Sequence, residues 1–171
     1  MKELIELTEV SKEDLPEIYC DLDEVLVDFM RGADAAVGGS FVKMDKDERW
    51  KRVNQTKGFW ANLGWKSNAK RLHDFIIRYN PHVLSAYTGR DPTSKVGKMK
   101  WLKKNTGFKR ANIHLVLRSQ KKNYATTDEK PNVLIDDYDK NIREWEAKGG
   151  IGILHTDVGK TISELKRLGF K

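Results

Sequence analysis

The sequence contains a single cysteine and no long apolar segment. Cys20 cannot form a disulfide within the chain, and this cysteine usage is typical of proteins in a reducing, cytoplasmic compartment. No apolar run approaches the roughly 20 residues that a membrane-spanning helix needs. Residues 1–4 do not begin a signal-peptide pattern. We therefore expect a cytoplasmic protein with no membrane partner.

Acidic residues are scarce in one part of the chain. The sequence has 32 Lys and Arg against 25 Asp and Glu, a formal net charge of +7. Residues 90–122 hold eleven Lys and Arg and one acid, Asp91, so this basic block alone carries +10. Such a block suits an anion-binding surface, for phosphates or nucleic acid, and it equally suits a solvated helix face that keeps a protein soluble. The charge alone leaves both interpretations open.

Internal repeats and low-complexity tracts are absent as well. Hydrophobic residues make up 39% of the chain and charged residues 33%. This composition supplies a core and excludes a disordered chain. A length of 171 residues fits a single domain, residues 1–171.

Short apolar runs alternate with amphipathic stretches. Strands are predicted at residues 18–20, 82–86, 113–117, 133–135 and 151–154. Apolar residues at helical spacing lie between and after the later strands, at 72–79, 96–102, 142–145 and 162–168. Nearly continuous apolar strands that alternate with helices are typical of a parallel sheet covered on both faces. We therefore predict an α/β fold with a Rossmann-like parallel sheet.

One long segment, from about residue 30 to 67, does not follow this alternation. It has no strand pattern and is dense in aromatics, with Trp50, Phe59, Trp60 and Trp65. We interpret it as a small, mostly helical insertion between the first two strands. One interpretation of these aromatic side chains is hydrophobic packing within the insertion itself.

Pairs of carboxylates follow two of the predicted strands. Asp21 and Asp23 come directly after the first strand, and in extended backbone residues two apart point to the same side. Two carboxylates held together repel each other unless a cation lies between them. The alternative is a helix N-terminus, where acids complement the helix dipole. Asp136 and Asp137 repeat the arrangement after the fourth strand.

The carboxyl ends of parallel strands meet at one edge of the sheet, so these four acids are expected to converge there. Oxygen ligands without His or Cys favour Mg²⁺, which we predict as the cofactor, facing a phosphate. Ser85 ends the second strand, where it either binds a phosphate oxygen or caps a helix. Lys121 or Lys122, after the third strand, either reaches the same phosphate or remains solvated.

In this order the four pieces resemble the motifs of the haloacid dehalogenase superfamily of phosphohydrolases. Those motifs are Asp-x-Asp, Ser or Thr, Lys and an acidic pair, here Asp21/Asp23, Ser85, Lys121 and Asp136/Asp137. The resemblance spans about residues 17–155. Within the superfamily the chain looks most like the 5′(3′)-deoxyribonucleotidase-like group of bacteria and phages. The strings at residues 59–65, 134–138, 141–142 and 149–152 support that placement.

The resemblance implies a role for each residue. Asp21 would be the nucleophile that forms an aspartyl-phosphate, and Asp23 the general acid and base. Mg²⁺ would be held by Asp21, Asp136, the backbone carbonyl of Asp23 and Asp137. Ser85 and Lys121 would hold the phosphoryl oxygens, with Lys122 as the alternative lysine. The insertion would be a cap over the substrate, in which Phe59, Trp60 and Trp65 stack on a base. Apart from the resemblance, Arg90, two residues past Thr88, either adds a phosphate contact or is a surface arginine.

The chain also departs from the family, because Glu24 stands where the second Asp is usually followed by Gly. A bulkier, charged residue there alters the turn or repels substrate. The sequence therefore leaves three functions open: a phosphatase for (deoxy)nucleoside monophosphates or another phosphomonoester, a phosphatase for polynucleotide ends such as 3′-phosphates, and a nucleic-acid-binding protein that has lost catalysis. A phospho-accepting receiver domain is disfavoured, since receivers lack a cap. Oligomeric state is not predicted.

Overall fold

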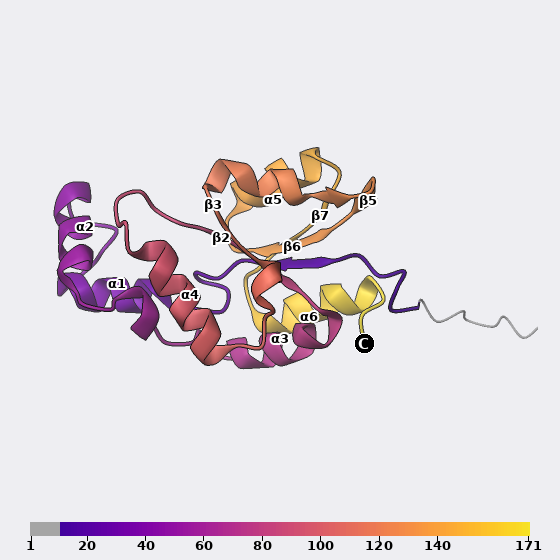
Figure 1. Ribbon diagram of the computed structural model, residues 1–171, viewed down its shortest axis with the longest axis horizontal. Coiled ribbons are helices and arrows are strands. Elements are labelled where there is room, and N and C mark those ends of the chain that lie inside the picture. The colour runs from indigo at the N-terminus through magenta and orange to yellow at the C-terminus, as the bar shows by residue number, and fades with distance from the viewer. Residues whose placement is uncertain (1–10) are drawn as a thin grey trace, which may run out of the picture.

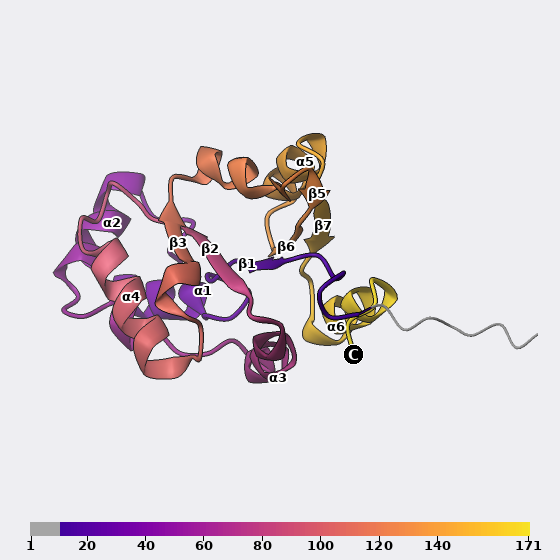
Figure 2. The ribbon, with the colours of Figure 1, turned by 45° about the vertical axis from the view of Figure 1, so that its right-hand side comes forward.

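Five parallel strands form the centre of the computed structural model, which describes residues 11–171. Figure 2 shows them side by side in the order β3-β2-β1-β6-β7. Their bounds are β1 Ile18–Cys20, β2 His82–Ala86, β3 Ile113–Val116, β6 Val133–Asp136 and β7 Ile151–Leu154. The predicted α/β fold and its five strands are confirmed, with β3 one residue shorter than expected. The first ten residues, where no leader pattern was expected, lie outside the described residues.

Helices cover both faces of the sheet (Figure 1). One face packs against α3 (Ala69–Ile76), α4 (Ser94–Asn105) and α6 (Val158–Arg167), and the other against α5 (Asp139–Ala147) and the 3₁₀ helix η4 (Arg118–Tyr124). Further short elements are η2 (Ile77–Tyr79), η3 (Arg110–Asn112) and the hairpin strands β4 (Thr126–Thr127) and β5 (Lys130–Pro131). Within residues 11–171, no helix has the length and apolar composition needed to cross a membrane.

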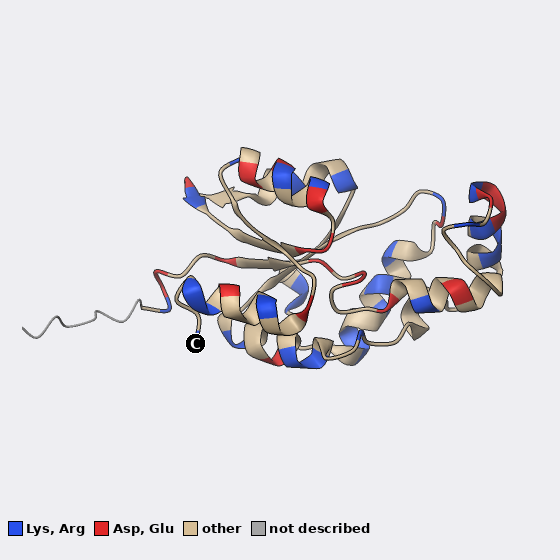
Figure 3. Ribbon diagram, turned by 180° about the vertical axis from the view of Figure 1, so that it is seen from behind, with Lys and Arg blue, Asp and Glu red and all other residues tan. Residues whose placement is uncertain are grey.

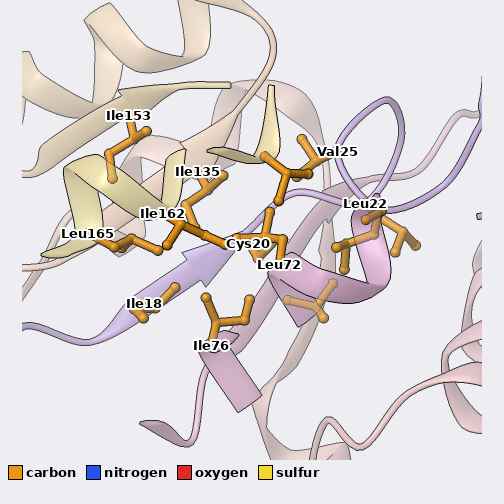
Figure 4. Packing of buried hydrophobic residues seen from close by; sticks show 14 of the residues in the cluster. Ile18, Cys20, Leu22, Val25, Leu72, Ile76, Ile135, Ile153, Ile162 and Leu165 are labelled. Atoms are coloured by element: carbon orange, nitrogen blue, oxygen red, sulfur yellow. The ribbon is translucent and has the colours of Figure 1, made fainter. Parts of the chain in front are cut away.

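Strand β1 shows how alternate side chains serve the two faces. Ile18 and Cys20 point toward α3 and α6, where Leu72 and Leu165 meet them (Figure 4). Tyr19, between them, lies in the opposite cluster with Trp145 of α5. All three residues of β1 are buried, which explains why its sequence is apolar throughout and does not alternate with polar residues.

Helix α4 differs from the prediction in one respect. Its buried residues are Ser94, Lys98, Trp101 and Leu102, at a helical spacing that defines its inward face. Val96 was expected on that face, and this expectation was wrong, because Val96 lies off the stripe and is 59% exposed. The inward face of α4 therefore includes a lysine, Lys98, beside its apolar residues.

The order of the strands places the ends of β1 and β6 at the point where the chain changes direction. From β1 the chain adds β2 and then β3 on one side, and it returns to add β6 and β7 on the other. Ligands of open parallel sheets bind at this switch point, beyond the carboxyl ends of the strands. The sequence puts Asp21 after β1 and Asp136 at the end of β6, so both stand at the switch point.

Between β1 and α3 the chain forms a helical insertion, named here the cap. It comprises α1 (Phe29–Val37), α2 (Lys46–Gln55) and η1 (Trp60–Asn62). The cap has its own apolar cluster, separate from those beside the sheet, with Val37, Phe41 and Val53 among its buried members. The two segments that join it to the sheet are paired, since Asp28 N–H donates to Gly64 O at 2.9 Å and Lys66 N–H to Leu26 O at 2.8 Å.

Candidate active site

Three carboxylates converge at the switch point, from the ends of β1 and β6. One carboxylate oxygen from each of Asp21, Asp136 and Asp137 lies within 4.8 Å of the others. Asp136 is fully buried and Asp21 is 7% exposed, whereas Asp137 faces solvent. The backbone fixes this approach, because Asp21 N–H donates to Ile135 O at 2.9 Å and so continues the pairing of β1 with β6. The structure thus brings together three of the four acids that were predicted to converge, and Asp23 is not in this group.

Lys121 lies between two of these acids. Its Nζ is 3.0 Å from Asp21 Oδ1 and 2.8 Å from Asp136 Oδ2, and its side chain is 4% exposed. Asn141 of α5 also donates to Asp136 Oδ2, at 3.0 Å, and Tyr138 N–H donates to Asp136 Oδ1 at 2.9 Å. The structure thus brings Lys121, and not Lys122, to the carboxylates, and it adds Asn141 as a residue that holds Asp136 in place.

The site carries more negative charge than its lysine balances. Burial and the Asp21 carboxylate raise the pKa of Asp136 to about 6. Desolvation, with Asp21 and Asp136, raises the pKa of Asp137 to about 7. Burial alone would lower the pKa of Lys121, but Asp21 and Asp136 outweigh it and raise that pKa above its usual value. Acidic segments at these strand ends and Lys and Arg along the helices are visible in Figure 3.

A divalent cation suits this charge and this donor set. Asp21, Asp136 and Asp137 offer only oxygen atoms, which are the ligands that Mg²⁺ prefers. Burial contributes most to the raised pKa values of Asp136 and Asp137, and repulsion from Asp21 adds to both. A bound cation would offset that repulsion. These three residues would hold the ion. The backbone carbonyl of Asp23 stays a predicted ligand.

Asp23 and Ser85 meet at a second lysine, Lys98 of α4. Lys98 Nζ donates to Asp23 Oδ2 at 2.6 Å, to Ser85 Oγ at 3.0 Å and to Ala86 O at 2.8 Å. Ser85 is fully buried at the end of β2. Burial raises the pKa of Asp23, Lys98 opposes this rise, and Asp21 adds to it. Lys98 was not among the predicted site residues, although its spacing from Ser94, Trp101 and Leu102 places it on the inward face of α4.

Glu24, the departure from the family pattern, lies in a tight turn after Asp23. Its φ of 63° is in the left-handed region, where glycine is usual. The side chain makes two contacts that a glycine would lack: Oε1 accepts from Met30 N–H at 2.8 Å, and Oε2 pairs with Lys66 Nζ at 2.7 Å. Glu24 keeps the turn despite its Cβ, and its charge is balanced by Lys66.

The aromatic residues proposed to bind a base lie in two places. Phe59 and Trp60 belong to the apolar cluster of the cap, 6% and 4% exposed, and Trp60 Nε1 donates to the buried Asp91 at 2.8 Å. Trp65 is half-buried against Trp101, with ring centroids 4.9 Å apart. These contacts fit the packing interpretation, and base stacking by these side chains stays a prediction.

Arg90, proposed as a phosphate contact, faces the cap. Its guanidinium pairs with Asp47 of α2 at 3.0 Å, and its carbonyl accepts from Asn54 Nδ2 at 2.9 Å. Arg90 therefore joins the loop after β2 to the cap, and its contact with phosphate stays a prediction.

No family model matches the chain, and no curated protein does. Among solved structures, the fold is similar to that of a hydrolase from Streptococcus pneumoniae TIGR4, with a TM-score of 0.55 and 13% sequence identity. The match covers 89% of this chain and 98% of that chain. At this identity the likeness shows the fold alone. The chemistry of this chain has to be argued from its own residues.

Proposed function

We propose that the protein is a Mg²⁺-dependent phosphomonoester hydrolase of the haloacid dehalogenase type, with (deoxy)nucleoside monophosphates as substrates. The observation that carries the proposal is the position of Asp21. Its carboxylate lies within 4.8 Å of carboxylate oxygens of Asp136 and Asp137, and its Oδ1 is 3.0 Å from Lys121 Nζ. A carboxylate in that setting would have Lys121 and a bound cation beside it to balance the charge of an incoming phosphoryl group.

The steps follow from the residues around Asp21. An Asp21 oxygen attacks phosphorus, the bond from phosphorus to the leaving oxygen breaks, and Asp23 gives its proton to that oxygen. Asp23 then takes a proton from water as the water attacks the phosphorus of the aspartyl-phosphate, which releases inorganic phosphate and restores Asp21. Ser85 and Lys121 hold the phosphoryl oxygens throughout. When bound, Mg²⁺ supplies charge neutralisation for the incoming phosphate dianion.

Phosphate release from a panel of nucleoside monophosphates, with Mg²⁺ or with a chelator, tests the proposal. We expect Mg²⁺-dependent release by the wild-type protein and none above background by Asp21→Asn. A matched control is Asp139→Asn, since Asp139 is 59% exposed and pairs with Arg143 on the surface of α5. Wild-type rates in Asp21→Asn, or in the presence of the chelator, would contradict the mechanism.

A groove beside α4 favours polynucleotide ends as a second candidate substrate. About 610 Å³ in volume, it lies between α4 and β3 and is lined by Lys95, Lys100, Lys103 and Arg110 together with apolar side chains. No acid is among its lining residues. Cations beside apolar surface suit a single strand of nucleic acid. The groove is on the helix whose inward face carries Lys98.

Salt dependence separates the two substrates. Binding of an end-phosphorylated oligonucleotide along the groove predicts an affinity that falls steeply as salt rises, whereas a mononucleotide responds weakly. We further expect Lys100→Gln with Lys103→Gln to weaken oligonucleotide binding while turnover of a small aryl phosphate is unchanged. A flat salt dependence with oligonucleotides would remove this candidate.

A further inference from the structure

Lys98 is buried at the candidate active site, where its ammonium group is fully hydrogen-bonded. Only 2% of its side chain is exposed, and its Nζ has three oxygen acceptors within 3.0 Å. An ammonium group has three N–H bonds, so each is used. The acceptors come from two separate segments, the turn after β1 and the end of β2. The buried ammonium group therefore fixes the position of the turn after β1 relative to the end of β2.

The contact with Asp23 fixes the orientation of its carboxyl group. Lys98 Nζ holds Oδ2 at 2.6 Å. The other oxygen, Oδ1, is screened from solvent and has no hydrogen-bond partner among residues 11–171. Because Oδ1 has no partner of its own, the contact of Oδ2 with Lys98 is the side-chain hydrogen bond that fixes the carboxylate among the described residues. Without Lys98, no described side-chain hydrogen bond would set the orientation of the Asp23 carboxyl group.

The contact with Ser85 acts in the same way on the hydroxyl group. Ser85 Oγ accepts from Lys98 at 3.0 Å, so its own proton remains free to be donated. The Ala86 carbonyl, which accepts from the same ammonium at 2.8 Å, holds Nζ at the end of β2. One cation thus sets the orientation of both the proposed acid and base and the proposed phosphate ligand.

The cap closes over this lysine. The ring of Trp60 lies above Lys98 Nζ, 5.1 Å from centroid to nitrogen, and Trp60 is itself fixed by its hydrogen bond to Asp91. The neighbouring Gly97 lets the helix approach, because a Cβ there would lie 2.4 Å from Trp60 Cβ. Lys98 is therefore held by the cap as well as by the strand ends.

We propose that Lys98 is a positioning residue of the hydrolase: through its Nζ it orients Asp23 for proton transfer to the leaving group and Ser85 for phosphate binding. This inference rests on the proposed function, in which Asp23 protonates the leaving oxygen. Lys98 does not touch the reacting atoms in this assignment. It acts through Asp23 and Ser85.

The identity of the leaving group provides the test. A nucleoside leaving group is a poor one and needs a proton from Asp23, whereas p-nitrophenolate leaves without it. The ratio kcat/KM reports only the steps up to departure of the leaving group, so the later attack of water does not enter. We expect Lys98→Met to lower kcat/KM for a nucleoside monophosphate by about 100-fold, within the usual range for general acid catalysis. The loss for p-nitrophenyl phosphate should be smaller by about tenfold or more.

Several comparisons distinguish positioning from a structural role. If only a fraction of a variant is correctly folded, its apparent kcat/KM falls by the same factor for both substrates. The ratio of the two kcat/KM values therefore does not depend on the active fraction. When Asp23 is already replaced by Asn, adding Lys98→Met should change kcat/KM by the same factor for both substrates. The matched control is Lys104→Met, an exposed lysine near the end of the same helix, which should leave both substrates unchanged.

Each outcome has one meaning. If the wild-type protein releases phosphate from neither substrate with Mg²⁺, the proposed function fails. If the wild-type protein is active and Lys98→Met lowers kcat/KM by the same factor for both substrates, the positioning role of Lys98 is overturned. The role is also overturned if Lys98→Met, added to Asp23→Asn, lowers kcat/KM more for the nucleoside monophosphate than for p-nitrophenyl phosphate. A loss confined mainly to the nucleoside monophosphate supports it.

Discussion

Replacement of Lys121 by methionine tests whether the carboxylate cluster depends on this one cation. Methionine keeps most of the apolar stem and removes the charge. Asp136, fully buried, would lose its ion pair at 2.8 Å, and Asp21 would lose its own at 3.0 Å. Removal of one partner from a buried ion pair costs about 3–5 kcal/mol, because the remaining charge stays buried without compensation. For a protein of this size, that corresponds to a fall in Tm of about 10 °C.

Chemical and thermal unfolding without Mg²⁺ measures this loss, and Lys122→Met is the matched control. Lys122 is the adjacent residue on η4, and we expect its replacement to change the free energy of unfolding by less than about 0.5 kcal/mol. Saturating Mg²⁺ should narrow the gap between Lys121→Met and the wild-type protein, because a divalent cation then balances the same carboxylates. A loss below about 1 kcal/mol for Lys121→Met, or an equal loss for both variants, would refute the reasoning.

Further predictions concern the metal, the turn and the cap. The pKa values of Asp136 and Asp137 in the folded protein are about 6 and about 7, above the usual value of 3.8. Between about pH 4 and 7 the folded state therefore holds more protons than the unfolded state. The metal-free protein should lose stability as the pH rises through this range. Mg²⁺ should therefore raise Tm more at pH 8 than at pH 5, and an equal shift at both would contradict the charge argument. Glu24→Ala should cost about 2 kcal/mol in urea unfolding, because it loses both side-chain contacts and keeps the left-handed φ, whereas Glu24→Gly relieves that backbone and should cost about 1 kcal/mol less. Trp60→Phe leaves the buried Asp91 oxygen without its donor and should destabilise by about 1–3 kcal/mol, more than the matched Trp50→Phe, which is measured in the same assay.

The strands and the carboxylate pair could be predicted from the sequence because each depends on local pattern. The run at residues 133–135 is apolar throughout, as a strand covered on both faces has to be, and Asp136 and Asp137 follow it directly. The topology of a parallel sheet then brings these acids to Asp21, although they are more than 100 residues away in the chain.

The contacts of Lys98 could not be predicted in the same way. Lys98 is 75 residues from Asp23, and its contact with Asp23 depends on which turn of α4 lies over the end of β2. In the sequence it is one of eleven Lys and Arg in the basic block, most of which are compatible with a solvated surface. Phe59 and Trp60 show a different limit: aromatic residues suit a core and a binding site equally well, and the sequence alone does not show that these two are buried in the cap.

The two segments that join the cap to the sheet are paired with each other, and together they are named here the stem of the cap. Val27 and Trp65 form an antiparallel bridge, and the hydrogen bonds from Asp28 to Gly64 and from Lys66 to Leu26 flank it. The points where the cap leaves and rejoins the sheet are therefore side by side. Insertions with adjacent ends are readily exchanged between proteins, because the host fold has no gap to span. A different cap can thus be joined at these two points while the strand ends and their carboxylates stay as they are.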